Sequence, residues 1–129
     1  MASIHYETVF DVSVDKAWTS LGDVGSPHRL FAGVLTDARM EGDIRTVTFA
    51  NGMVVREQIV DVNESDRRVA YAVIDGVFKH HSASMQLFAA GEGRCRFVWI
   101  SDFLPNKQAE MVKPLVEQGC AAMRRALEG

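Results

Sequence analysis

The stretch NKQAEMVKPLVEQGCAAMRRAL (Asn106–Leu127) carries the longest helical pattern in the chain, and the rest of the fold is predicted from it. Apolar or small residues recur there at steps of three and four, which places them on one face of a helix: Ala109, Val112, Val116, Gly119, Met123 and Leu127. A single amphipathic helix cannot bury its own apolar face. The residues before it are therefore expected to form the opposite wall of the core.

Three residues of this stretch carry separate expectations. Asn106 is predicted to cap the first helical turn with its side chain. Pro114 has no amide hydrogen to donate, so it is predicted to kink or restart the helix at a cost of roughly 3 kcal/mol. Gly119 lies on the apolar face, where the missing side chain allows another part of the backbone to come close.

The composition describes one ordinary globular domain, residues 1–129. With 47% hydrophobic and 24% charged residues, the chain can bury a core and shows no bias toward disorder. The net charge of -3 gives no basis for binding nucleic acid or an anionic membrane surface. No apolar run is long enough to span a bilayer, and the first residues lack the pattern of a signal peptide. Cys95 and Cys120 do not make a disulfide framework, so they are expected to be free thiols in a cytoplasmic protein. No cofactor or metal ion is expected, because the sequence contains no metal motif or nucleotide loop.

The apolar pattern changes along the preceding part of the chain. His5–Val12 alternates and predicts a first strand, after which Ser13 caps a short helix. Ser26 and Pro27 have the residue types that begin a second short helix. From there on the period is two, and six strands are predicted between turn sequences rich in glycine, asparagine and aspartate: Val34–Met40, Ile44–Phe49, Met53–Val62, Arg68–Ile74, Phe78–Ala89 and Arg94–Phe103.

Because every link between these strands is short, the simplest topology is an antiparallel meander. The sequence therefore predicts an α+β fold. One curved, seven-stranded antiparallel sheet wraps around the long C-terminal helix, with two short helices after the first strand.

Three short sequence motifs occur within this order of elements and resemble motifs of a known family: Val14–Trp18, Gly42–Glu57 and Val98–Phe103. They resemble, in this order, the opening of the first short helix, the "G-x-x-R … D-G-x-x-x-E" hairpin and the last strand of the bacterial polyketide cyclase/dehydrase group. The whole chain resembles the helix-grip fold of the START-like (SRPBCC) superfamily, which also includes lipid-transfer domains and the birch-pollen-allergen proteins. The resemblance implies a cavity between sheet and helix that takes a hydrophobic ligand.

The hairpin of the predicted strands Ile44–Phe49 and Met53–Val62 allows a register prediction. A three-residue loop, Ala50–Gly52, with its glycine left-handed, pairs Phe49 with Met53. Counting back puts Arg45 opposite Glu57 on the helix-facing side. Two interpretations stay open: a desolvated ion pair that fixes the register, or the polar end of a ligand pocket in which Arg45 meets a ligand oxygen. Acid catalysis by Glu57 is the least expected role, because Arg45 opposes a rise of its pKa.

Five further residues are predicted to share the helix-facing side of the later strands: Tyr71, His81, Met85, Trp99 and Ser101. If that side is concave, they and the Arg45–Glu57 pair line a mostly apolar cavity with a few polar points. Simple packing against the final helix is the competing interpretation, and it is favoured for Met85 and Trp99. His80 and His81 point to opposite faces of one strand and cannot chelate a metal ion together.

Three functions follow from these observations. The first is binding of a hydrophobic small molecule, aromatic or polyketide- or lipid-like, in the cavity. The second, implied by the resemblance, is a cyclase, aromatase or dehydratase in which Arg45, Tyr71 or His81 polarises a carbonyl. The third is an interaction module with a filled interior that acts as a homodimer through exposed apolar residues such as Val54, Val60 or Ile100. The sequence contains no nucleophile–base spacing, metal motif or nucleotide loop that selects among reactions.

Overall fold

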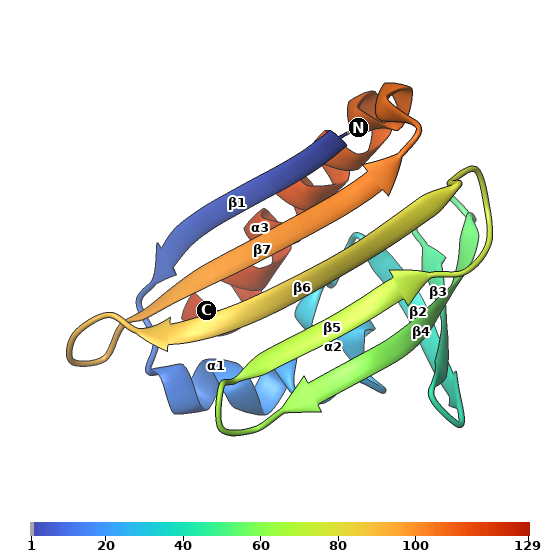
Figure 1. Cartoon of the computed structure of the whole chain (residues 1–129). Coiled ribbons are helices and arrows are strands. Elements are labelled where there is room, and N and C mark those ends of the chain that lie inside the picture. Colours follow the sequence, from blue (N-terminus) through green and yellow to red (C-terminus); the bar gives the residue numbers. More distant parts are fainter. Residues whose placement is uncertain (1) are drawn as a thin grey trace.

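The computed structural model describes residues 2–129 and contains a seven-stranded antiparallel sheet in the order β1-β7-β6-β5-β4-β3-β2. The strands have these bounds: β1 (Ala2–Phe10), β2 (Leu35–Glu41), β3 (Ile44–Phe49), β4 (Val54–Asn63), β5 (Arg68–Val73), β6 (His80–Ala89) and β7 (Cys95–Leu104). The helical segments are α1 (Val14–Leu21), α2 (Pro27–Leu30), the 3-10 turn η1 (Asn106–Gln108) and α3 (Ala109–Glu128). Figure 1 shows α3 behind β7 and β1, with α1 and α2 at one end of the sheet. The predicted α+β architecture is confirmed.

The first strand differs most from its predicted bounds. It begins at Ala2 rather than His5 and ends at Phe10 rather than Val12. Its pairing with β7 is continuous from Ala2 opposite Phe103 to Phe10 opposite Cys95, so the backbone hydrogen bonds of the neighbouring strand set its length. The chain then leaves the sheet for α1, whose first turn is capped by the Ser13 hydroxyl as predicted.

The start of the long helix also differs from the prediction. Residues 106–108 form the 3-10 turn η1, and α3 begins at Ala109 without a side-chain cap, so the predicted cap by Asn106 is wrong. A 3-10 turn at a helix end can satisfy backbone groups that a cap otherwise takes. The helix continues through Pro114 instead of restarting there. Pro114 and Glu110, whose carbonyl loses its partner, are both exposed, so water can hydrate that carbonyl.

Gly119 permits a close contact, but with a side chain rather than with backbone. A Cβ atom at this position would lie 2.9 Å from Cζ3 of Trp99 and 3.1 Å from its Cη2. The helix therefore approaches β7 across the Trp99 indole, and glycine leaves the room that the ring occupies. The ring of Phe31, just after α2, lies 5.8 Å from that of Trp99 and extends the same contact.

The core lies between α3 and the helix-facing side of the sheet. At the end where β1 finishes and β7 begins, four side chains are fully buried, with 0% exposure: Phe10, Cys95, Phe97 and Met123. The rings of Phe10 and Phe97 lie 5.8 Å apart. We call this part the closed end. Cys120 is buried as well, although the predicted apolar stripe left it out, so the buried face of α3 is wider than that stripe.

Two irregularities bend the opposite half of the sheet. The pairing register shifts between Leu35 and Asp37 in β2, and between Ile59 and Asp61 in β4. A β-bulge inserts one unpaired residue, bends its strand and increases the local twist. In β4 the extra residue is Val60, which is 64% exposed. These bends curve β2–β4 around the space in front of the first half of α3.

Candidate functional site

The β3–β4 hairpin has the predicted register. Arg45 pairs with Glu57 across the strands, and the amide of Phe49 donates to the carbonyl of Met53 over 2.8 Å. Gly52 has a φ of 90°, the left-handed conformation that the three-residue loop requires. Because side chains alternate along each strand, this register fixes which residues of the hairpin face the helix.

Arg45 and Glu57 form an ion pair on that inner side, and only 7% and 8% of their surfaces are exposed. Nε of Arg45 donates to Oε1 of Glu57 over 2.9 Å, and Nη2 lies 2.8 Å from the same oxygen. The third nitrogen, Nη1, donates to the carbonyl of Val24 over 3.0 Å. The guanidinium also lies over the Tyr71 ring, with Cζ 5.4 Å from the ring centroid. Every nitrogen of Arg45 is thus engaged within the protein.

The electrostatics of this group follow from its burial. Burial raises the pKa of the Glu57 carboxyl, while the charge and hydrogen bond of Arg45 oppose that rise. Burial, reinforced by the nearby negative charge of Glu57, raises the pKa of the Tyr71 phenol far above its ordinary value. Tyr71 is therefore neutral at physiological pH, and the contact distances show Arg45 and Glu57 as a compensated pair.

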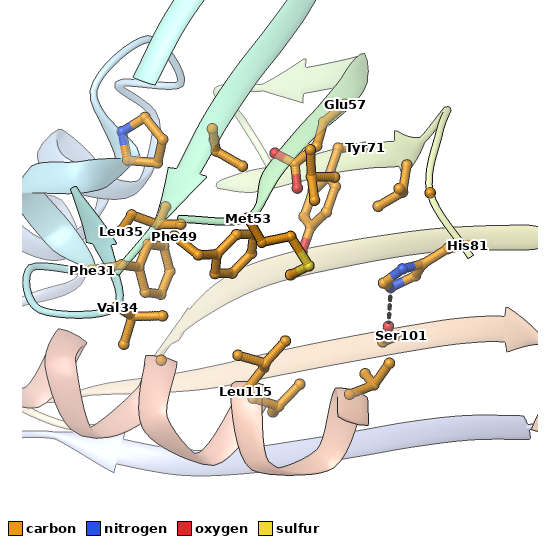
Figure 2. A pocket seen from close by; sticks show the side chains of 18 of the residues that line it. Phe31, Val34, Leu35, Phe49, Met53, Glu57, Tyr71, His81, Ser101 and Leu115 are labelled. Carbon is orange, nitrogen blue, oxygen red and sulfur yellow. Dashed lines mark hydrogen bonds between the residues drawn. The ribbon is translucent and has the colours of Figure 1, made fainter. Parts of the chain in front are cut away.

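A cavity of about 200 Å³ lies between the sheet and the first half of α3. All seven residues predicted to contact a ligand are in its wall: Arg45, Glu57, Tyr71, His81, Met85, Trp99 and Ser101. Figure 2 shows Tyr71 and Glu57 pointing from the sheet into this space, with Leu115 of α3 on the opposite side. Met85 and Trp99 also belong to the buried core, where Trp99 packs against Gly119 of α3, so these two residues both pack and line the cavity.

Most of the wall is apolar, and most of that apolar wall was not predicted from the sequence. The additional residues come from the loop after α2, the start of β2, the β3–β4 hairpin, the β5–β6 loop and α3. They include Phe31, Val34, Leu35, Phe49, Met53, Phe78, Met111 and Leu115. Met111 and Leu115 adjoin the predicted stripe of α3, so a wider apolar face at steps of four would have identified them. Phe78 was placed in a strand but precedes β6, in a loop whose path the alternation of strands does not describe.

His81 and Ser101 are brought together by the pairing of β6 with β7. Nε2 of His81 lies 2.7 Å from the Ser101 hydroxyl, and Figure 2 shows this contact at the cavity wall. The Phe78 ring contacts the imidazole in a tilted arrangement, with the ring centroids 4.4 Å apart and the planes at 52°. Burial lowers the pKa of His81 to about 4, so the ring is neutral at physiological pH. The pair has the atom types of a nucleophile and its base, but no group among residues 2–129 orients the imidazole through Nδ1.

Two buried nitrogens in the cavity wall, Trp99 Nε1 and His81 Nδ1, have no hydrogen-bond partner within the described chain. The Trp99 indole rests on Gly119 through its six-membered ring, so Nε1, in the five-membered ring, is held away from the helix. The Trp99 N–H opposes the rise of the Tyr71 pKa, as a donor close to the phenol oxygen does, although the two groups do not have the geometry of a hydrogen bond. Buried donors without partners are rare in proteins, so these atoms mark where a bound group would gain most.

The cysteines take no part in this site. Cys95 and Cys120 are free and buried, as predicted. Burial raises the pKa of Cys120 to about 12 and also raises that of Cys95, so neither thiol is a nucleophile at neutral pH. Across residues 2–129, no three side chains of the metal-binding types come together. That same part of the chain has no helix with the length and apolar character needed to cross a membrane.

Comparison of the sequence with known protein families gives a match over nearly the whole chain. Residues 1–128 match the family described as "Polyketide cyclase / dehydrase and lipid transport". No curated protein sequence matches the chain.

Solved structures show the same fold at low sequence identity. An uncharacterized protein from Bacillus thuringiensis has a TM-score of 0.91 at 15% identity, over 99% of this chain and 100% of its own. The protein XoxI from Bacillus cereus has a TM-score of 0.90 at 15% identity, over 98% and 96%. Norcoclaurine synthase from Thalictrum flavum, in complex with dopamine and hydroxybenzaldehyde, has a TM-score of 0.75 at 22% identity, over 98% and 83%. These likenesses confirm the predicted helix-grip fold.

Proposed function

Because the chain belongs to the polyketide cyclase/dehydrase and lipid transport family, we propose that it binds a hydrophobic small molecule in the cavity between the sheet and α3. The observation that carries this proposal is the cavity itself. It has a volume of about 200 Å³, and its wall combines many apolar side chains with a few polar ones, the usual composition of a small-molecule site. The free thiols of Cys95 and Cys120 support a location in the reducing cytoplasm.

A matched pair of variants tests this binding. Leu115 lies in the cavity wall, whereas Lys113, on the same helix, is exposed and outside that wall. Leu115→Trp fills part of the cavity, and Lys113→Trp adds the same ring to the outer surface. The uncharged dye N-phenyl-1-naphthylamine, whose fluorescence rises in an apolar site, is expected to bind the original protein and Lys113→Trp alike. Leu115→Trp is expected to weaken that binding about tenfold or more. Equal binding by both variants would place the dye elsewhere and contradict the proposal.

A second candidate function is catalysis in the same cavity, of the cyclase or dehydratase kind that the family name describes. The observation that favours it is the His81–Ser101 contact of 2.7 Å in a cavity wall that also contains the Tyr71 phenol. A neutral imidazole and a phenol can each donate a hydrogen bond to a developing oxyanion. Norcoclaurine synthase, which has the same fold, has been solved in complex with two aromatic molecules, dopamine and hydroxybenzaldehyde.

Turnover separates the two functions. If the protein is an enzyme, Tyr71→Phe and His81→Ala are each expected to lower turnover of its substrate by about a hundredfold while ligand binding persists. Unchanged turnover in both variants would show that catalysis does not use Tyr71 or His81, and no turnover by any of the proteins would leave binding as the whole function. The open space between the sheet and α3 favours the first two functions over the third, a homodimer with a filled interior. A measurement of the molecular mass in solution tests dimer formation, independently of whether the cavity binds a ligand.

A further inference from the structure

Arg45 and Glu57 differ in how many of their polar atoms have partners within the protein. The three nitrogens of Arg45 are all engaged, two by Oε1 of Glu57 and one by the carbonyl of Val24. Within residues 2–129, no hydrogen bond reaches the second carboxylate oxygen, Oε2 of Glu57. Figure 2 shows the Glu57 carboxylate directed into the cavity beside Tyr71. Each nitrogen of Arg45 thus has a contact within the protein, whereas one oxygen of Glu57 remains an acceptor for a group in the cavity.

Close to this acceptor the wall offers donors. The Trp99 N–H is buried without a partner and lies near the Tyr71 phenol, and the phenol itself interacts with the charge of Glu57. A ligand hydroxyl can donate its proton to Oε2 of Glu57 and accept from the Trp99 N–H or the Tyr71 hydroxyl. A hydroxyl group is both donor and acceptor, so it satisfies both sides of this corner.

A ligand carboxylate is not expected to bind at the position that a hydroxyl group would take. Its negative charge would face the Glu57 carboxylate rather than the Arg45 guanidinium, whose nitrogens are turned to other partners. The surrounding wall is mostly apolar and gives no compensation for a buried charge. On this geometry Glu57, rather than Arg45, meets the polar group of the ligand; the sequence had left open that Arg45 meets a ligand oxygen.

Resting on the proposed binding function, we infer that the cavity selects an uncharged hydrophobic molecule bearing a hydroxyl group, a phenol or an alcohol. The hydroxyl is held by Glu57, Tyr71 and Trp99, and the matching carboxylic acid is rejected. His81, held by Ser101, has its free Nδ1 in the same wall, available for a second polar group of the ligand. The selectivity comes from the Glu57 oxygen that Arg45 leaves unused.

Two compounds with one ring skeleton test the inference: 2-naphthol, neutral at pH 7, and 2-naphthoate, an anion at that pH. Isothermal titration calorimetry of the original protein is expected to show 2-naphthol binding roughly tenfold or more tighter than 2-naphthoate. Equal affinities, or tighter binding of the acid, would overturn the inference. The uncharged dye keeps the two proposals apart, because dye binding without discrimination leaves the binding function standing. Failure of the dye and both naphthalenes to bind contradicts both.

Variants locate the discrimination at the ion pair. Glu57→Gln removes the carboxylate and leaves Arg45 uncompensated, so the preference is expected to reverse in favour of 2-naphthoate. Should this variant fold poorly, the double substitution Arg45→Met, Glu57→Met removes both charges together, and the two compounds are expected to bind within about threefold of each other. Glu7→Gln makes the same change in net charge at an exposed ion pair with Arg96, outside the cavity wall, and is expected to keep the original preference. A double variant that still rejects the acid would overturn the inference.

Discussion

The closed end of the core and the cavity are built from the same strand. Along β7, the inward residues Cys95 and Phe97 meet Phe10 and Met123 with no exposed surface. Two steps further on, Trp99 and Ser101 line an open space. The boundary lies where the Trp99 indole rests on Gly119. One alternating pattern of buried residues therefore produces solid packing at one end and a ligand-sized cavity at the other, and the side chains of the facing elements make the difference.

The largest effect should come from removing a ring at the closed end. Phe97→Ala is expected to lower the free energy of unfolding by about 4 kcal/mol, because Phe97 is fully enclosed and its loss leaves a void. Phe49→Ala, in the wall of the cavity, removes a ring that is only half-buried and is expected to cost less than half as much. Urea unfolding of both variants measures the difference. Equal losses would erase the distinction between the two regions.

Next in size is the loss of one partner in the buried ion pair. Arg45→Met is expected to cost about 3 kcal/mol, because Glu57 is left buried and charged without its partner. The double variant Arg45→Met, Glu57→Met is expected to recover most of that loss, since no lone charge remains. Urea unfolding of the single and double variants completes the comparison. A double variant as unstable as the single one would show that the ion pair itself stabilises the part of the sheet that surrounds the cavity.

The boundary between the two regions can be disturbed by one methyl group. Gly119→Ala places a Cβ 2.9 Å from the Trp99 ring and is expected to destabilise the protein by about 2 kcal/mol as the ring is displaced. The near-ultraviolet circular dichroism of the tryptophans should change with it. An unobstructed glycine in a helix would instead gain about 1 kcal/mol on substitution by alanine. A stabilised variant would therefore contradict the contact.

The smallest effect concerns pH at the cavity wall. Burial lowers the pKa of His81 from 6.5 to about 4 in the folded protein, so the unfolded chain takes up a proton first as the pH falls. The stability that neutral His81 supports is full above pH 6.5 and is lost as the pH approaches 4. Because the side chain is partly exposed, the loss is expected to be about 1–2 kcal/mol.

The comparison variant for this effect is His81→Gln, which does not titrate. Its unfolding free energy, measured by urea between pH 7 and pH 4, is expected to fall less steeply than that of the original protein. The raised pKa of Glu57 contributes a slope of the opposite sign in both proteins, so it cancels in the difference. Parallel pH profiles would show that the folded protein binds a proton at His81 as readily as the unfolded chain.

The parts that were predicted correctly depend on local rules. The pairing of Arg45 with Glu57 follows from a loop of three residues and the alternation of side chains, and both can be recognised in the sequence. The same alternation placed Tyr71, His81 and Ser101 on the inner side. The capping role of Asn106 was wrong because a 3-10 turn took over the start of the helix.

What was not predicted depends on how distant elements meet. The hydrogen bond between His81 and Ser101 depends on the register of β6 against β7. The contact of Arg45 Nη1 with the carbonyl of Val24 depends on the path of the loop that brings Val24 beside Arg45. Whether the inner side is hollow depends on the distance between Leu115 and the sheet, which the curvature of β2–β4 sets. No sequence period reports that curvature, because a bulge is one extra residue in an otherwise regular pattern.

The most direct test is a crystal structure of the protein with 2-naphthol bound. The account predicts the naphthalene rings between α3 and the sheet, in contact with Leu115, with the hydroxyl oxygen within hydrogen-bonding distance of the Glu57 carboxylate. Rings bound on the outer surface, or a cavity closed by side chains, would contradict it.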